Sequence, residues 1–127
     1  MVDATISMGD LFTQLKISLP QIFDGTYLTL KRINYSGWLE MQIVLYRNYN
    51  SDFDKILEIS TFDSQGEDLK NFISRSQVSG GWGNEAIEVA LQYVNTLQNV
   101  DEIILIGDIG GNTPQEVKAK RAQYKQL

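Results

Sequence analysis

The sequence predicts an α/β fold, because apolar runs of strand length alternate with segments whose apolar residues recur at helical spacing. The expected order is helix, strand, strand, helix, helix, strand, helix, with no internal repeat and no low-complexity linker. A length of 127 residues provides for one domain. We therefore interpret residues 1–127 as a single domain.

The first helix begins at residue 8, and its apolar face recurs at i, i+3, i+4 and i+7. Pro20 should kink this helix near Lys16, or restart it with Ser18 as the cap, because proline removes a backbone donor. Residues 24–38 receive no assignment, apart from a turn expected at 34–37. The face consists of Met8, Leu11, Phe12, Leu15, Leu19 and Ile22.

Two strands should follow. Residues 41–46 (MQIVLY) form a nearly continuous apolar run, which is typical of a strand inside a sheet. Residues 55–62 (KILEISTF) alternate and suit a strand exposed on one side. The link at 47–54 is too short for a crossover helix, so the two strands should be antiparallel.

Helical spacing returns in two segments separated by glycines at 79–83, and residues 102–107 (EIILIG) then give the clearest buried strand. Thr113 and Glu116 form a capping box around Pro114, which predicts a last helix. The helical positions are Leu69, Phe72 and Ile73, and then Ile87, Ala90, Leu91, Val94 and Leu97.

The composition limits the chemistry, because the chain has no Cys and no His. Disulfides, thiolate chemistry, Cys/His zinc sites and Ser-His-Asp triads are excluded, so any metal must be held by oxygen. A net charge of -5 gives no basic face for nucleic acid or anionic lipid. With no apolar run of membrane length and no signal-peptide pattern at residues 1–10, we expect a soluble, cytoplasmic protein.

Three segments could carry a ligand. Asp3, Thr5 and Ser7 place three oxygens on alternate residues, which in an extended segment share one face. Alternatively, Ser7 caps the helix and Asp3 is solvated. Asp108 follows the buried strand, where it is either a ligand or a turn residue. The glycine-rich residues 79–84 either approach a ligand or only join two helices.

Other motifs match less well. Residues 81–86 fit the dinucleotide fingerprint G-x-G-x-x-A, but a helical segment precedes them instead of a strand. No P-loop pattern is present in the sequence. Asp3 and Thr5 fit part of the D-x-D-x-[TV] motif of haloacid-dehalogenase phosphatases, but the second Asp is missing.

Together these segments resemble a von Willebrand factor type A domain with its metal-ion-dependent adhesion site. Residues 3–8 (DATISM) resemble the D-x-[ST]-x-S motif, and residues 104–108 (ILIGD) resemble the strand that ends in the distal Asp. Residues 44–48 (VLYRN) resemble a strand ending in Y-R-D, with Asn for Asp. Residues 80–86 (GGWGNEA) resemble the glycine loop, so the likeness covers nearly the whole chain in order.

The resemblance implies a doubly wound, mostly parallel sheet with an antiparallel edge hairpin and helices on both faces. It also implies a Mg²⁺ ion, or Mn²⁺ or Ca²⁺, completed by a carboxylate of a protein partner, in a module that does not catalyse a reaction. Nucleic acid and membrane insertion are not implied. The implied ligands are Asp3, Thr5, Ser7 and Asp108, and the implied partner-binding rim is Ser79, Trp82 and Asn84.

The sequence departs from the family pattern in three places. The family places a Thr or Asp near Trp82, so a fifth ligand would have to come from Ser79 or Asn84. Ile6 replaces a usual glycine. Only residues 1–2 correspond to the first strand, and residues 1–127 end before the family's last elements, so the domain is expected to be incomplete at both ends.

Two alternative functions stay open at this point. One is a metal-free interaction module that uses the same loops. The other is a Mg²⁺-dependent phosphoryl-transfer enzyme that uses Asp3 or Asp108.

Two further side chains carry predictions. We expect Arg47 to be structural and to pair with Asp52 and Asp54. Trp82 is expected to be partly exposed at the rim, or else packed over Ile87.

Overall fold

Strand β2 (Val44–Tyr46) is the middle strand of a three-stranded sheet, as the apolar run at 41–46 predicts. Strand β1 (Val2–Asp3) pairs with it in parallel. All three residues of β2 are buried, in agreement with its apolar sequence. The fold is therefore α/β with a small mixed sheet, in a computed structural model that describes residues 1–37, 39–63 and 65–124.

Strand β3 (Leu57–Ile59) lies on the other side of β2 and confirms the expected antiparallel hairpin. The amide of Arg47 donates to the carbonyl of Ile56 at 2.9 Å, and the amide of Ser60 donates to that of Ile43 at 2.9 Å. The pairing therefore runs in opposite directions along the two strands. The link also contains a short helix, α2 (Phe53–Ile56), which the sequence did not predict.

The chain divides into two compact units, and the first carries β1, β2 and the helices α4 (Ile87–Val94) and α5 (Pro114–Tyr124). Its segments are Met1–Gly9, Val44–Glu58 and Gln77–Leu127. A hydrophobic cluster of this unit joins the sheet to α4, as the helical spacing at 87–94 predicts. The cluster consists of Val44, Tyr46 and Ala90, with Met1, Leu57, Ile87 and Tyr93 packed against it.

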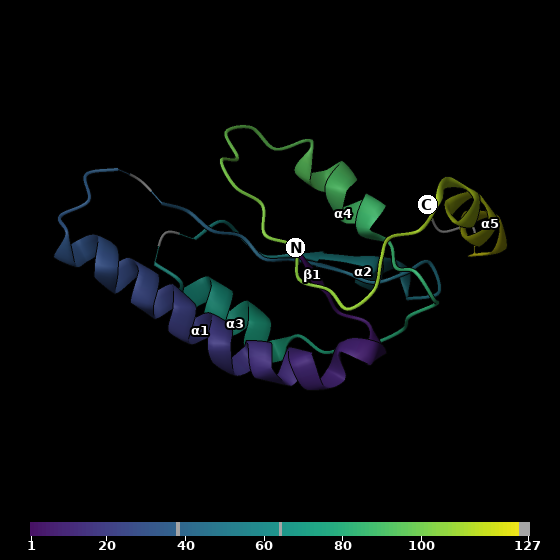
Figure 1. Cartoon of the computed structure of the whole chain (residues 1–127), viewed down its shortest axis with the longest axis horizontal. Helices are drawn as coiled ribbons and strands as arrows, with labels where there is room; N and C mark the ends of the chain where they lie inside the picture. Colours follow the sequence, from purple (N-terminus) through teal and green to yellow (C-terminus); the bar gives the residue numbers. More distant parts are fainter. Residues whose placement is uncertain (38, 64, 125–127) are drawn as a thin grey trace. The chain divides into compact units, whose positions relative to one another are not determined.

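The second unit comprises Asp10–Ile43 and Ile59–Ser76 and contains two helices, α1 (Gly9–Arg32) and α3 (Glu67–Arg75). They lie side by side in Figure 1, and Lys16 Nζ donates to the carbonyl of Ser74 at 3.3 Å. Helix α3 confirms the periodicity read at 69–73. The buried side chains of the two helices are Phe12, Leu15, Phe23, Leu69, Phe72 and Ile73.

The alternative of a helix that restarts at Pro20 is wrong, because α1 continues through this residue to Arg32. One lost hydrogen bond is evidently offset by the turns on either side, and the two basic residues in the last turn favour a helix end there. Asn34 has a φ of 53° just beyond it. Leu11 and Ile22, which we expected on the apolar face, are 43% and 55% exposed.

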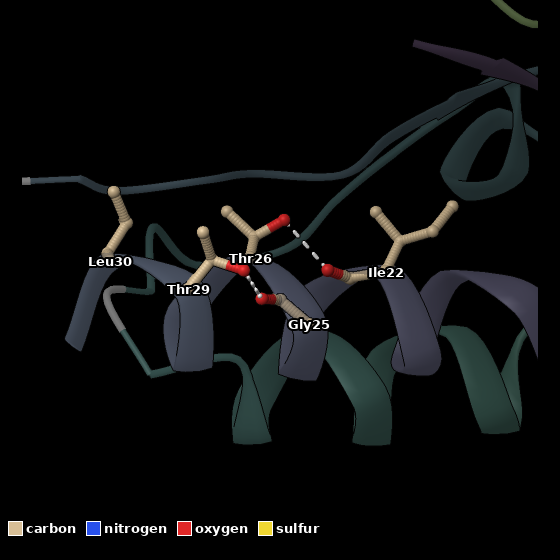
Figure 2. A pocket seen from close by; sticks show the side chains of 5 residues that line it. All are labelled: Ile22, Gly25, Thr26, Thr29 and Leu30. Carbon is tan, nitrogen blue, oxygen red and sulfur yellow. Dashed lines mark hydrogen bonds between the residues drawn. The ribbon is translucent and has the colours of Figure 1, made fainter. Parts of the chain in front are cut away.

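A shallow groove of about 420 Å³ lies along α1 (Figure 2). Thr26 Oγ1 donates to the carbonyl of Ile22, and Thr29 Oγ1 to that of Gly25, both at 2.8 Å. The hydroxyls of this groove are thus engaged by the helix itself, and its lining has no titratable side chain. We therefore do not place a functional site there.

The prediction of a buried strand at 102–107 is wrong. The segment is extended beside β1, since Ile106 donates to the carbonyl of Met1 and Asp3 donates to that of Ile106, both at 2.9 Å. However, Ile104 is 64% exposed and Leu105 is 50% exposed. An apolar run favours extended backbone, but burial requires elements that cover it from both faces.

The predicted capping box is confirmed at the start of α5. The amide of Thr113 donates to Glu116 Oε1 at 3.1 Å, and the amide of Glu116 donates to Thr113 Oγ1 at 3.2 Å. Helix α4 ends at Val94, so Leu97 lies beyond it. Within the part of the chain that the structure describes, no helix is long and apolar enough to cross a membrane.

Candidate metal-binding site

Three loops of the first unit are joined by backbone hydrogen bonds. The amide of Ser79 donates to the carbonyl of Ala4, and the amide of Ile6 donates to that of Gly80, both at 3.0 Å. The amide of Glu85 donates to the carbonyl of Gly110, also at 3.0 Å. The loop after β1, the glycine loop and the loop after residue 107 therefore meet, although they are far apart in sequence.

The first loop brings Asp3, Thr5 and Ser7 together. Asp3 Oδ1 accepts hydrogen bonds from Thr5 N at 2.9 Å and from Thr5 Oγ1 at 2.6 Å. The hydroxyl oxygens of Thr5 and Ser7 lie 3.4 Å apart. Asp3 and Thr5 are fully buried, whereas Ser7 is exposed. The alternate spacing thus places their oxygens in a row that runs from the buried Asp3 to the exposed Ser7.

Asp108 completes what we call the acidic site, consisting of Asp3, Thr5, Ser7 and Asp108. Burial raises the pKa of Asp3, the Thr5 hydrogen bonds oppose this increase, and the nearby Asp108 carboxyl adds to it through both its side-chain contact with Asp3 and its charge. Asp3 Oδ2 is buried and has no hydrogen-bond partner among the described residues. A buried carboxylate oxygen beside a second carboxylate is an environment that a cation would stabilise.

The donor set suits a hard cation. Two carboxylates and two hydroxyls are oxygen ligands of the kind that Mg²⁺ and Ca²⁺ prefer, and they leave coordination positions for water or for a partner. Among the described residues, no three Asp or Glu side chains gather closely enough to hold a metal by themselves. A metal at this position would therefore depend on Thr5 and Ser7 as well as on the two Asp residues.

The glycine loop approaches Thr5 closely. Gly81 has a φ of 126°, and a Cβ placed on it would lie 3.3 Å from Thr5 Cβ and 3.3 Å from Glu85 Oε1. Trp82 is 36% exposed, as predicted for the rim, and Lys120 Nζ lies 4.8 Å from the centre of its ring. Glycine at position 81 thus permits both the left-handed backbone and the close approach.

A second polar cluster, which sequence reasoning missed, lies behind this loop. Lys120 Nζ donates to the carbonyls of Trp82 at 2.5 Å and Asn84 at 2.7 Å, and to Asn112 Oδ1 at 2.6 Å. Asn48 Nδ2 donates to the same two carbonyls, at 3.2 and 2.6 Å. We call Lys120, Asn48, Glu85 and Asn112 the lysine cluster.

Glu85 belongs to this cluster and is 3% exposed. Its Oε2 accepts a hydrogen bond from Asn48 Nδ2 at 2.8 Å. Burial raises the pKa of Glu85, with Asp3 adding to the increase, while hydrogen bonds from Asn48 and the Trp82 amide oppose it. A charged residue directly before a helical segment was the only sequence signal for it.

The rim residues Ser79 and Asn84 do not fill the same role. The Ser79 amide holds the loop to Ala4, as described above, and its side chain is half-buried. Asn84 Nδ2 donates to Glu116 Oε1 at 2.9 Å, which directs this amide toward α5. Neither contact joins a rim side chain to the acidic site.

Arg47 is buried, as expected of a structural residue, but its predicted ion-pair partners were wrong. Its Nη1 donates to Glu58 Oε1 at 2.6 Å and to the Lys55 carbonyl at 2.7 Å, and its Nη2 donates to the Gln77 carbonyl at 2.5 Å. The partner is therefore Glu58 on β3 instead of Asp52 or Asp54. Antiparallel pairing of β2 and β3 brings Glu58 beside Arg47.

No protein-family model, curated protein or solved structure matches this chain.

Proposed function

We propose that this chain is a divalent-metal-dependent protein-protein interaction module of the von Willebrand factor type A kind, in a cytoplasmic protein, with the doubly wound sheet of that family. Asp3, Thr5, Ser7 and Asp108 would hold Mg²⁺. The observation that carries the proposal is the buried Asp3 Oδ2, which has no hydrogen-bond partner among the described residues and lies near a second carboxylate.

The chemistry of such a site is recognition. A divalent ion with two carboxylate and two hydroxyl ligands keeps positive charge and open positions, so it accepts an acidic side chain from a partner. The exposed surface beside these ligands is apolar, since Ile6 is 66% exposed and Ile109 is 41% exposed, and Trp82 adds an aromatic edge. A partner carboxylate flanked by apolar residues fits this rim best.

Calorimetric titration with Mg²⁺ and Mn²⁺ tests the proposal. We expect the wild type to bind one ion and Asp108→Asn to bind it at least tenfold more weakly, because one charged ligand is lost. Asp108 is exposed, so this variant should fold. Asp101→Asn, also exposed and on the same segment, is the matched control and should bind like the wild type.

Two results would contradict the proposal. Absence of any heat with the wild type would favour the metal-free module. Equal weakening by Asp101→Asn and Asp108→Asn would indicate diffuse attraction of cations to an acidic surface instead of a defined site.

A further inference from the structure

Among the buried oxygens of the first unit that have no hydrogen-bond partner in the described residues, two come from neighbouring strands. They are Asp3 Oδ2 on β1 and Tyr46 Oη on β2. Asp3 and Tyr46 stand opposite each other in the parallel pair, so their side chains project from the same face of the sheet. Both residues are 0% exposed.

Gly107 borders both oxygens. A Cβ placed on Gly107 would lie 2.9 Å from Tyr46 Oη and 3.9 Å from Asp3 Oδ2. The two oxygens thus flank one point beside a residue that has no side chain. A Cβ at position 107 would press on Tyr46 Oη and would also lie 3.4 Å from Asp3 Cβ.

We infer that one water molecule binds between Tyr46 Oη and Asp3 Oδ2, beside Gly107, and holds the Asp3 carboxylate in place. The phenol donates a hydrogen bond to the water oxygen, and the water donates one to Oδ2. Buried polar groups in folded proteins form hydrogen bonds to protein or to ordered water. A water that bonds to both of these oxygens would be held in place by them. Burial and three nearby carboxylates raise the pKa of Tyr46, so its hydroxyl remains a donor.

The consequence for the acidic site rests on the proposed function. Groups behind a metal ligand fix its orientation, and their loss commonly weakens metal binding by about 10–100-fold. Tyr46 is in this sense a positioning residue for Asp3. It has no role as a ligand of its own.

Thermal unfolding of the full chain in a metal chelator tests the water bridge without any metal. If the bridge exists, Tyr46→Phe lowers the Tm by about 3–5 °C, because a hydrogen bond is lost. In an Asp3→Asn background the decrease should be less than half as large. If the hydroxyl has no partner in solution, Tyr46→Phe raises the Tm, and the inference is overturned.

Gly107→Ala tests the space. Its Cβ should displace the water and press on Tyr46 Oη, lowering the Tm by about 4–10 °C. Adding Tyr46→Phe removes the pressing oxygen, so the double variant should recover at least half of that loss. Additive decreases would show that position 107 and Tyr46 Oη do not share this space.

Metal titration provides the second readout. Tyr46→Phe should bind Mn²⁺ about tenfold more weakly than the wild type, whereas Tyr49→Phe should bind it normally. Tyr49 is the matched control, since it is equally buried but its hydroxyl donates to Glu88 at 2.7 Å. If the wild type binds no metal, the proposed function fails, and the unfolding data alone then decide the bridge. Normal binding by Tyr46→Phe would refute the positioning role.

Discussion

The lysine cluster and the acidic site are two polar groups of the same unit that differ in their balance of charge. In the lysine cluster, the ammonium of Lys120 meets three oxygens at 2.5 to 2.7 Å, and Glu85 accepts from Asn48. In the acidic site, Asp3 faces a second carboxylate, and Oδ2 has no protein partner among the described residues. The first cluster contains its own cation, and the second does not.

This difference in charge balance separates a polar cluster with a structural role from one that could bind a ligand. A polar cluster whose members satisfy one another fixes the loops that form it, and it has little to offer a ligand. A buried carboxylate beside a second carboxylate, with no cation, costs free energy in the folded state, and an incoming cation relieves that cost. The lysine cluster therefore holds the glycine loop in place, whereas under the proposed function the acidic site next to it is the part that takes a ligand.

The largest expected effect comes from removing the internal cation. Lys120→Met keeps the length of the side chain but removes three hydrogen bonds of a buried ammonium, and Asn112 Oδ1 loses the donor that Lys120 provides, so we expect the unfolding free energy to fall by about 3 kcal/mol. Urea unfolding measures it. Lys118→Met, exposed on the same helix, should stay within about 0.5 kcal/mol of the wild type. Equal stability of the two variants would remove the structural role of the cluster.

Asp3→Asn should have the opposite sign. Without metal it removes one of two facing charges and lets an amide donate toward Asp108, so we expect the Tm in chelator to rise by about 3–5 °C. The same variant should lose Mg²⁺ binding. A lower Tm in chelator would mean that the Asp3 carboxylate is already stabilised inside the protein, and the contrast with the lysine cluster would not hold.

Sequence reasoning identified residues of the acidic site that lie together, but it identified none of the lysine cluster. Local spacing is sufficient to place Asp3, Thr5 and Ser7 on one face, and a carboxylate after an extended segment is visible as Asp108. The lysine cluster depends on residues 48, 85, 112 and 120, which only the folded chain brings together. A lysine at position 120 of an unremarkable charged helix carries no signal in the sequence that it is buried.

The fold shows the same division between local and long-range information. The antiparallel hairpin and the capping box at Thr113 and Glu116 follow from link length and local side-chain chemistry, and both were predicted. Exposure of residues 102–107 was not predicted, because hydropathy does not say which elements cover a strand. Continuation of α1 through Pro20 also depends on packing beyond the local sequence.

The pH dependence of stability provides a smaller effect that tests the role of Glu85 in the lysine cluster. Because the folded-state pKa of Glu85 is raised, the folded protein holds this proton more tightly than the unfolded chain does. Stability from this group is therefore present below the ordinary carboxyl pKa and is lost as the pH rises through the raised value. We expect Glu85→Gln to flatten the decrease in Tm between pH 4 and 8, measured in chelator.

The control for this slope is Glu116, a second carboxyl whose pKa is shifted in the opposite direction. The pKa of Glu116 is lowered, chiefly by the hydrogen bond from the Thr113 amide. Its contribution to stability is thus lost as the pH falls, so Glu116→Gln should change the slope in the opposite direction. An unchanged slope in Glu85→Gln would show that Glu85 does not contribute to the pH dependence of stability.

The smallest effect on stability is expected at Ser7, the exposed end of the acidic site. Ser7→Ala should change the unfolding free energy by less than about 0.5 kcal/mol, because its hydroxyl is exposed and lies 3.4 Å from Thr5 Oγ1. Mg²⁺ binding should nevertheless weaken about tenfold, since one ligand oxygen is lost. Ser79→Ala is the matched control by calorimetry and should bind normally. If Ser79→Ala weakens Mg²⁺ binding and Ser7→Ala does not, the hydroxyl ligand comes from the glycine loop. The glycine loop would then bind the metal itself, and would not only support the acidic site.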